Sequence, residues 1–385
     1  MNFRRVRSKI HALGRLALTA SQIKSEFNMG YWRQAREYNQ FRTQLGFQLT
    51  PYFRAGLWDT RRSLISRLAT LSHQDLKVLQ KRMYPQGSSI LVRDKEKATR
   101  TLVAAGLPVA PVLAIAGLSG EKGSTSDCFP FIESQAGILE ILENSPKHGV
   151  VFKPTLGGGG RSVHVFRSAN SRHLIHFDGT PWSVAKLMGV LATEKVWKIE
   201  ARLEQHEALN QIIGDGIGAL RLTTFVMNDG TVQLMLPVWK LPIGNTGLDH
   251  FGHGDGAAAA PIDPETGCIG PARYLAGIDT TLKHPETGAD FVGMKIPFWR
   301  EACDLAKSTQ RCFPDFRSLG CDIAITPEGP VVIEINLRWS LNLHQVPWQQ
   351  GIVQGEFVKF LEELDSEDVI NRRVRQIPKS SDFKA

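Results

Sequence analysis

The stretch CDIAITPEGPVVIEIN (residues 321–336) is the segment that decides the fold. Two runs of alternating apolar residues flank a tight-turn sequence at residues 327–329, which predicts a β-hairpin. Asp322 lies on the first strand. Glu334 and Asn336 lie two residues apart on the second strand, so they share a face. Pairing of the two strands would bring Asp322 beside them.

Two carboxylates and one amide oxygen at a single place predict a Mg²⁺ site, because Mg²⁺ prefers oxygen ligands and takes others from phosphates. The alternative is an acidic pair on a solvated strand face. The apolar run VVI before Glu334 favours a buried strand, in which carboxylates without a cation would be costly.

A second segment, VVFKPTLGGGGRSVHVF (residues 150–166), places Lys153 on a strand just before four consecutive glycines, Gly157, Gly158, Gly159 and Gly160. Glycines at such density weaken a strand, so a close backbone approach to a ligand is the natural reason for them. Bare amides and a nearby lysine suit a phosphate chain. The order of residues fits neither the P-loop nor the dinucleotide fingerprint. A flexible surface loop is the alternative.

Strand-like and helical segments alternate around these two stretches. The sequence predicts a strand at residues 88–92, a helix that Asp94 caps and Gly106 ends, a strand within 109–117 and a helix within 133–145. Residues 223–237 predict another hairpin, with its turn at 228–230. This alternation indicates an α/β or α+β architecture.

The composition is that of an ordinary globular protein of 385 residues, 42% hydrophobic and 22% charged, which excludes disordered and collagen-like chains. Charge is uneven: residues 1–82 hold 16 Lys/Arg and 4 Asp/Glu, or +12, and the other 303 residues hold 30 and 34, or −4. Five scattered cysteines argue against a disulfide framework or zinc site and favour a reducing, cytoplasmic compartment.

The basic first segment predicts helices. Ile10, Leu13, Ala17 and Ala20 are expected on one face of an amphipathic helix, which we prefer to a secretory signal; a transit peptide stays open. Residues 1–82 would pack against the rest of the chain, contact an anionic membrane peripherally, or bind nucleic acid; the last is disfavoured because no aromatic-interleaved RNA motif is present.

Taken together, the motifs resemble the ATP-grasp superfamily, and among its members the sugar-transfer-associated proteins related to α-L-glutamate ligases. The resemblance covers roughly residues 90–350 and rests on the order of DK, FKP with its glycine loop, EARLEQHEAL, GALRLTTFV, DHFGHGDGAAAAPIDPETG and LGCDIAITPEGPVVIEIN. It implies an α+β fold in which two α+β subdomains grip ATP, preceded by a mainly helical basic region. The expected divisions are residues 1–88 for that region, 89–199 and 200–355 for the subdomains, and 356–385 for a charged tail.

The resemblance also implies how the nucleotide would be held. Lys95 and Lys153 would contact the phosphates, and the glycine loop would close over them. The adenine contacts would lie at the end of the strand VWKIEARL, with Glu200 at the exocyclic amine and backbone groups of Arg202 and Leu203 beside it. Glu204 or His206 would contact the ribose.

For the reaction itself, the resemblance implies Mg²⁺ on Asp322, Glu334 and Asn336, with Glu334 bridging. Arg221 would face the reacting phosphate; a strand-edge salt bridge is its alternative. Candidate contacts to the acceptor substrate are Lys240, Asp249, His250 and Arg338. Departures from the family pattern fall near this acceptor pocket: LRWSLNLHQ follows Asn336, Gly218 and Ala219 precede the Arg221 strand, and His250 stands where relatives carry Asn.

The implied activity is that of an ATP- and Mg²⁺-dependent ligase that joins a small-molecule carboxylate to an amine through an acyl phosphate, in cell-surface polysaccharide or amino-acid-conjugate biosynthesis. A phosphotransferase on the same fold is the alternative within enzymes. A membrane-surface or nucleic-acid-binding protein that uses the basic segment is the alternative outside them.

Overall fold

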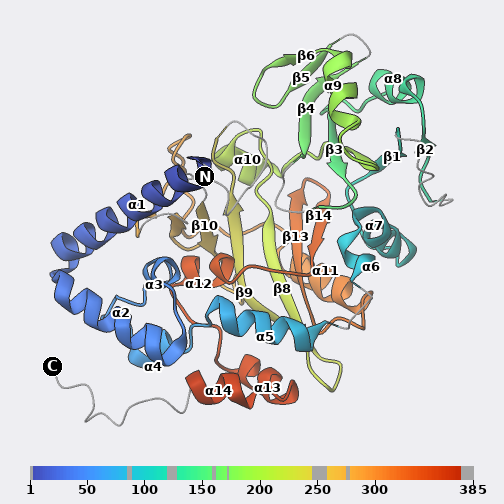
Figure 1. The fold of residues 1–385 in the computed structure, drawn as a ribbon. Helices are drawn as coiled ribbons and strands as arrows, with labels where there is room; N and C mark the ends of the chain where they lie inside the picture. Colours follow the sequence, from blue (N-terminus) through green and yellow to red (C-terminus); the bar gives the residue numbers. More distant parts are fainter. Residues whose placement is uncertain are drawn as a thin grey trace.

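The computed structural model of the chain describes residues 3–84, 89–118, 128–157, 162–170, 173–244, 258–274 and 278–373. The described part of the chain contains two seven-stranded sheets (Figure 1). The strands of one lie within residues 112–201, and the strands of the other lie within residues 220–336. The expected α+β architecture with two sheet-bearing parts is therefore confirmed.

The first sheet has the strand order β2-β1-β7-β3-β4-β5-β6. Its strands are β1 (Val112–Ala116), β2 (Phe131–Ile132), β3 (Val150–Pro154), β4 (His164–Ala169), β5 (Leu174–His176), β6 (Pro181–Trp182) and β7 (Trp197–Ala201). Helices α8 (Gln135–Glu143) and α9 (Val184–Leu191) bury leucines and an isoleucine against it. Because β7 pairs with β1 and β3, the strand that carries Glu200 lies inside this sheet, and the expected boundary at 199/200 cuts through it.

The second sheet has the order β12-β11-β10-β9-β8-β13-β14. Its strands are β8 (Leu220–Val226), β9 (Val232–Leu241), β10 (Ala258–Pro261), β11 (Ala272–Tyr274), β12 (Thr280–Thr281), β13 (Ser318–Thr326) and β14 (Gly329–Asn336). Both predicted hairpins are present: β8 pairs with β9, and β13 pairs with β14 so that Asp322 lies opposite Glu334. Side chains alternate between the two faces, since Leu220 and Leu222 lie in one core cluster and Phe225 lies in another.

Helices cover both faces of the second sheet. Helices α10 (Glu207–Ile213) and α11 (Trp299–Arg311) share the larger core cluster with α6 (Ile90–Arg93) and α7 (Lys95–Ala104). The opposite face carries α12 (Leu341–Trp348), α13 (Glu356–Glu363) and α14 (Glu367–Arg373). The chain from residue 356 to 373, expected as a charged tail, is thus two helices that bury Phe357, Phe360 and Val369. Residues 374–385 lie outside the described part.

The basic first segment is helical, as predicted: α1 (Phe3–Phe27), α2 (Tyr31–Leu45), α3 (Leu49–Arg54), α4 (Leu64–Leu68) and α5 (His73–Met83). The first four helices and their connections build a separate aromatic cluster that includes Phe41, Tyr52 and Trp58. In contrast, α5 packs with α13 and α14 beneath the second sheet (Figure 1). Leu71 and the buried amide of Gln345 exchange two hydrogen bonds of 2.7 and 3.0 Å, so this segment packs against the body.

Two details of the sequence-based prediction are corrected. Residues 90–93 form a helical turn rather than a strand, because the turn buries Val92 under α7, where Asp94 caps the helix by accepting from the backbone of Glu96. A short apolar run is compatible with either conformation. In α1, Ala17 is exposed, and the inward stripe contains Ala20 and Ile23.

Among the described residues, we find no helix with both the length and the apolar character that crossing a membrane requires.

Candidate functional site

The two sheets meet at a small cavity between α7, β7 and β14. Lys95 and Thr99 of α7, Lys198 of β7 and Glu334 of β14 supply its polar lining. The backbone N–H of Lys95 donates to the carbonyl of Thr155, directly after β3, at 2.8 Å. Side chains predicted from distant motifs are therefore brought together where the sheets approach each other.

In the first sheet, Glu200 lies between two lysines. Its Oε2 is 2.6 Å from Lys153 Nζ, and its Oε1 is 2.6 Å from Lys198 Nζ. Lys153 and Lys198 are direct cross-strand partners on β3 and β7, and Lys198 also donates to the hydroxyl of Thr99 at 2.9 Å. Like charges opposite each other are unfavourable in a sheet, so the carboxylate between them stabilises the pair.

Burial and charge act together in this cluster. Lys198 and Glu200 are each 2% exposed, whereas the side chain of Lys153 is 16% exposed. Burial lowers the pKa of Lys198, although Glu200 opposes that shift. Burial also opposes ionisation of Glu200, but the charges of Lys153 and Lys198 outweigh it and hold the pKa of that carboxyl below its usual value. Glu200 therefore serves as the shared ion-pair partner of both lysines.

Lys95 connects both sheets and the glycine-rich loop. Its Nζ donates to the carbonyl of Gly157 at 2.9 Å and lies 3.8 Å from Glu334 Oε1. Burial lowers the pKa of Lys95. Gly157 has a φ of 122°, a conformation that other residues rarely adopt. The predicted phosphate contacts at Gly158, Gly159 and Gly160 lie outside the described residues.

In the second sheet, Asp322 also lies between two cations. Arg221 donates to it in a bidentate pair, from Nε at 2.6 Å and from Nη2 at 2.9 Å, and Lys240 Nζ lies 3.2 Å from Oδ2. The side-chain amide of Asn336 donates to the same oxygen at 3.2 Å. Burial disfavours the charged carboxylate, but Arg221 and Lys240 outweigh it and lower the pKa of Asp322 to about 2.

The oxygen atoms that face the cavity determine how a Mg²⁺ ion would fit. Glu334 is partly exposed, and its ion-pair partner among the described residues is the Lys95 ammonium at 3.8 Å. Asn336 keeps a carbonyl oxygen when its amide donates to Asp322. These two residues fit the oxygen chemistry of Mg²⁺. The oxygens of Asp322 accept from Arg221, Lys240 and Asn336, so a cation there would compete with them. The role of Asp322 as a ligand remains a prediction.

No three His, Cys, Asp or Glu side chains converge as a metal site within the part of the chain that the structure describes. Among the described residues, Glu334 and Asn336 present the oxygens that would suit Mg²⁺, and oxygens of a bound phosphate chain could add to them.

The hinge after β7 is held by a second group of charged side chains. Arg202 donates to the carbonyl of His148 at 3.0 Å and pairs with the carboxylate of Asp215 in the α10–β8 connection. Arg167 of β4 lies 3.3 Å from the same carboxylate. Both guanidinium groups lie over the ring of Phe177, at 4.1 Å for Arg167 and 5.2 Å for Arg202. These contacts join the first sheet to the segment that leads into the second.

The remaining hinge residues have modest structural roles. The backbone N–H of Arg202 donates to Gly149 at 2.9 Å, Leu203 is half-buried, and Glu204 lies 3.3 Å from His148. His206 accepts from the backbone N–H of Ala208 at the start of α10. The nucleotide roles predicted for these residues and for Glu200 stay predictions.

Candidate acceptor residues are divided between two environments. Lys240 is 5% exposed and joins the Asp322 cluster, whereas Arg338 is exposed just after β14. Asp249 and His250 lie outside the described residues. Sequence reasoning missed Lys198, although a signal was present: it stands two residues before Glu200, so both had to share one face of β7.

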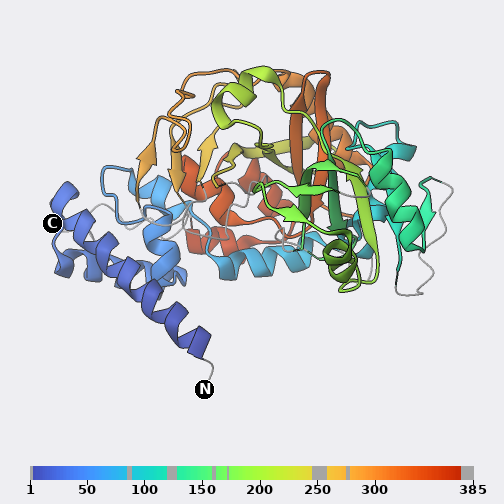
Figure 2. The ribbon, with the colours of Figure 1, turned by 90° about the horizontal axis from the view of Figure 1, so that it is seen from above.

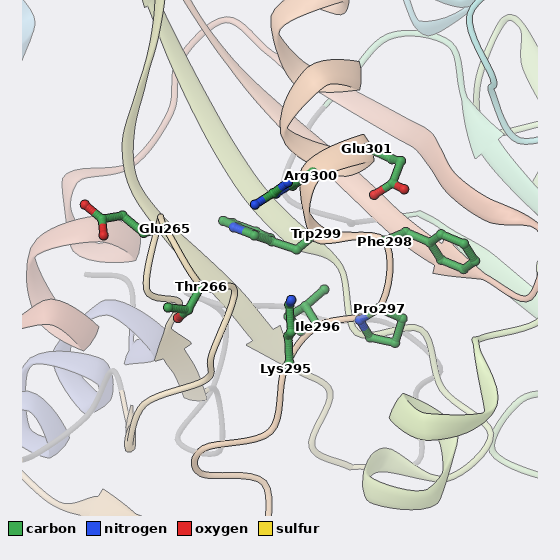
Figure 3. A pocket seen from close by; sticks show the side chains of 9 residues that line it. All are labelled: Glu265, Thr266, Lys295, Ile296, Pro297, Phe298, Trp299, Arg300 and Glu301. Carbon is green, nitrogen blue, oxygen red and sulfur yellow. The ribbon is translucent and has the colours of Figure 1, made fainter.

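A wider pocket of about 570 Å³ lies at the start of α11 (Figure 3). Acidic and basic side chains line it together, including Glu265, Lys295 and Arg300. Phe298, at its edge, contacts the ring of His206 with 5.8 Å between centroids. This places the pocket beside the hinge segment rather than at the junction of the two sheets.

Comparisons with known proteins agree with the motif-based resemblance. A family model described as sugar-transfer associated ATP-grasp matches residues 76–359. No protein of curated function matches the chain.

Similar solved structures include three synthetases and ligases. They are N5-carboxyaminoimidazole synthetase from Staphylococcus aureus with ADP (14% identity, TM-score 0.41, 74% of this chain and 58% of that one), the VanG D-Ala:D-Ser ligase from Enterococcus faecalis (12%, 0.42, 76% and 64%) and phosphoribosylamine–glycine ligase from Thermotoga maritima (12%, 0.43, 77% and 61%). In all three cases, this chain covers less than two thirds of the other protein.

Proposed function

Because the chain belongs to the sugar-transfer associated ATP-grasp family, we propose that it is an ATP-dependent ligase that joins a carboxylate to an amine. The observation that carries the proposal is the convergence of Lys95, Lys153 and Glu334 from three elements at the junction of the two sheets. A triphosphate needs cations and, through its metal, an oxygen ligand at one place. This junction offers both.

The chemistry starts from the inertness of a carboxylate, whose charge and resonance oppose nucleophilic attack. In the proposed first step, a carboxylate oxygen of the substrate attacks the γ-phosphorus of ATP, the bond to the β-phosphate oxygen breaks, and ADP leaves. In the second step, the amine attacks the carbonyl carbon of the acyl phosphate, the carbon–oxygen bond breaks, phosphate leaves, and the nitrogen loses a proton. No protein nucleophile is required.

The residues of the chain act by binding and by stabilising charge. Lys95 and Lys153 neutralise phosphate oxygens on which negative charge develops, and removing one such contact typically costs about 100-fold or more in rate. Bound Mg²⁺ on Glu334 and Asn336 would supply further charge stabilisation. Arg221 and Lys240 contribute through the net positive charge of their cluster with Asp322, next to those two ligands.

The pathway is proposed on the family description alone. Association with sugar transfer supports a role in cell-surface polysaccharide or amino-acid-conjugate biosynthesis. A cytoplasmic reaction would agree with the supply of ATP and with the five free cysteines.

The test is a substrate screen with Mg-ATP and pools of acids and amines, read by product mass spectrometry and by ADP and phosphate release. We expect ADP and phosphate in equal amounts together with an amide product. ADP with a phosphorylated product and no free phosphate would establish the phosphotransferase alternative instead.

The matched variants are Glu334→Gln, at the junction, and Glu328→Gln, at the exposed turn of the same hairpin. We expect Glu334→Gln to lower turnover by about 100-fold or more and Glu328→Gln to leave it within a factor of three. Unchanged turnover in Glu334→Gln would contradict the assignment of the junction as the site.

A further inference from the structure

The turn of the α1–α2 hairpin combines exposed aromatic rings with cations. Trp32 is 91% exposed and Tyr31 is 51% exposed. Lys24, Arg33 and Arg36 are exposed as well, and the ammonium of Lys24 lies 4.9 Å from the centroid of Tyr31. We call these five residues the hairpin tip. In Figure 1 the α1–α2 turn lies at the far end of the helical region, on the side of the molecule opposite the first sheet, and Figure 2 shows the helical region from above.

The tip is held in a defined orientation. Gln34 is buried and donates to the carbonyls of Ala20 and Met29, at 2.9 and 2.7 Å, which fixes the start of α2 against α1. Trp32 and Arg36 lie two residues on either side of Gln34. A helix turns by about 200° over two residues, so both lie on the face opposite the buried one. The aromatic ring and the cation are therefore presented outward together.

Acidic residues near the tip do not cancel its charge. Glu37 lies 3.0 Å from the buried Arg67 and 3.9 Å from Arg33, and Glu26 is the other acid of the two helices. Residues 1–82 carry a formal charge of +12, whereas the rest of the chain carries −4. The formal charge therefore favours contact of an extended anionic surface with this segment over the rest of the chain.

The helical segment also exposes aliphatic side chains outside the tip. Leu18 of α1 is 71% exposed and Ile65 of α4 is 63% exposed. Nucleic acids are bound by cations and by stacked rings, and aliphatic groups contribute little to that. A bilayer surface takes up both aromatic and aliphatic side chains, while its anionic lipids attract lysine and arginine. Tryptophan and tyrosine are also suited to the boundary between lipid and water.

We propose that the hairpin tip docks on an anionic lipid surface. Trp32 and Tyr31 enter the headgroup region, and Lys24, Arg33 and Arg36 pair with lipid phosphates and carboxylates. Gln22 of α1 donates to Asp279 at 2.7 Å, beside β12, so the docked tip is joined to the β12 edge of the second sheet. The inference does not depend on the proposed ligase reaction.

The test is cosedimentation of the full chain with vesicles of phosphatidylcholine alone and with vesicles containing about 30% phosphatidylserine, at about 0.15 M salt. We expect binding only to the phosphatidylserine vesicles and weaker binding at higher salt. The double variant Arg33→Gln/Arg36→Gln should bind roughly tenfold more weakly. The matched control is Lys295→Gln/Arg300→Gln, which removes two exposed cations at the start of α11 and should bind like the wild type.

Trp32 provides an independent readout. Trp32→Ala should bind more weakly and lose the blue shift of tryptophan fluorescence on vesicles, Trp32→Phe should keep most of the affinity, and Leu282→Ala, another exposed apolar residue, should match the wild type. Circular dichroism checks that each variant is folded.

The proposal is overturned by lack of vesicle binding, by equal binding to both vesicle types, or by unchanged affinity in the tip variants. It is also overturned if a DNA duplex of about 20 base pairs displaces the protein from vesicles and its own binding requires Trp32.

Discussion

Each sheet of this molecule buries one carboxylate between two cations, but the two clusters differ in what they leave accessible. In the first sheet, Glu200 pairs with Lys153 and Lys198, and 16% of the Lys153 side chain stays exposed. In the second sheet, Asp322, Arg221 and Lys240 are all nearly covered. The same charge pattern can thus offer a cation to a ligand or fix strands in place.

The difference follows from how completely each cluster is covered. Glu200 and Lys153 lie on β7 and β3, and Lys198, which shares the Glu200 carboxylate, lines the cavity between the sheets. Asp322 pairs directly with Arg221 across β13 and β8 and also contacts Lys240 of β9 and Asn336 of β14. We therefore expect variants of the Asp322 cluster to lower stability first and variants of the Glu200 cluster to lower activity first.

The largest effect is expected for Asp322→Asn. The change removes the buried carboxylate that Arg221 and Lys240 share, which should lower the free energy of unfolding by about 3–5 kcal/mol. Urea denaturation measures this loss of stability. The control is Asp290→Asn, which changes an exposed acid paired with the exposed Lys283 and should leave the free energy of unfolding within about 0.5 kcal/mol of the wild type. A loss below about 1 kcal/mol for Asp322→Asn would remove the distinction between the clusters.

Next in size is Lys153→Met. It should reduce ATP-dependent turnover by about 100-fold or more, because a charge that stabilises phosphate oxygens is lost. The measurement is ADP release at saturating ATP, with Lys295→Met as an exposed lysine control. Turnover within threefold of the wild type would show that the accessible cluster has no catalytic role.

The acid stability of the protein tests the buried charge of Asp322. Its pKa of about 2 lies below the usual 3.8, so the ionised carboxylate contributes stability that is complete above about pH 4 and is lost as the pH falls toward 2. The contribution amounts to about 2 kcal/mol. Urea midpoints measured between pH 5 and 2 should therefore fall more steeply for the wild type than for Asp322→Asn. Parallel slopes would contradict this assignment.

The smallest effect is expected at the hinge. Asp215→Asn weakens the contacts to Arg167 and Arg202, but over half of that carboxylate is exposed, so the stability change should stay below about 1 kcal/mol. Because exposed pairs are screened by salt, the difference from the wild type should shrink at high ionic strength. A larger loss of stability that does not change with salt would show that the Asp215 contacts behave like the buried clusters.

The sequence predicted those parts of the site that are local in the chain. Strand alternation and the turn at residues 327–329 were sufficient to place Asp322 opposite Glu334. The DK and FKP motifs drew attention to Lys95 and Lys153, whose roles in nucleotide binding stay predictions. The surroundings of Asp322 could not be predicted in the same way. Arg221 lies 101 residues away, and its approach depends on the order β9-β8-β13, which no local pattern encodes.

The helices of the basic first segment, residues 1–82, likewise make contacts that local sequence patterns could not predict. Their existence followed from composition and periodicity. Ala20 lies on the predicted inward face of α1, but Ala17 does not, because alanine is compatible with either face. The burial of α5 depends on Phe357 and Phe360, near the other end of the chain, so no pattern within residues 73–83 could identify its partner.

This packing of α5 also imposes an order on folding during synthesis. Leu76, Leu79 and Met83 leave the ribosome early, while Phe357, Phe360 and Val369, which cover them, are made more than 270 residues later. At a synthesis rate of about 5–20 residues per second, the apolar face of α5 stays uncovered for roughly 15 to 60 s. The aromatic cluster of α1–α4 can form in that time, whereas the core that includes α5 closes only when the last helices are released.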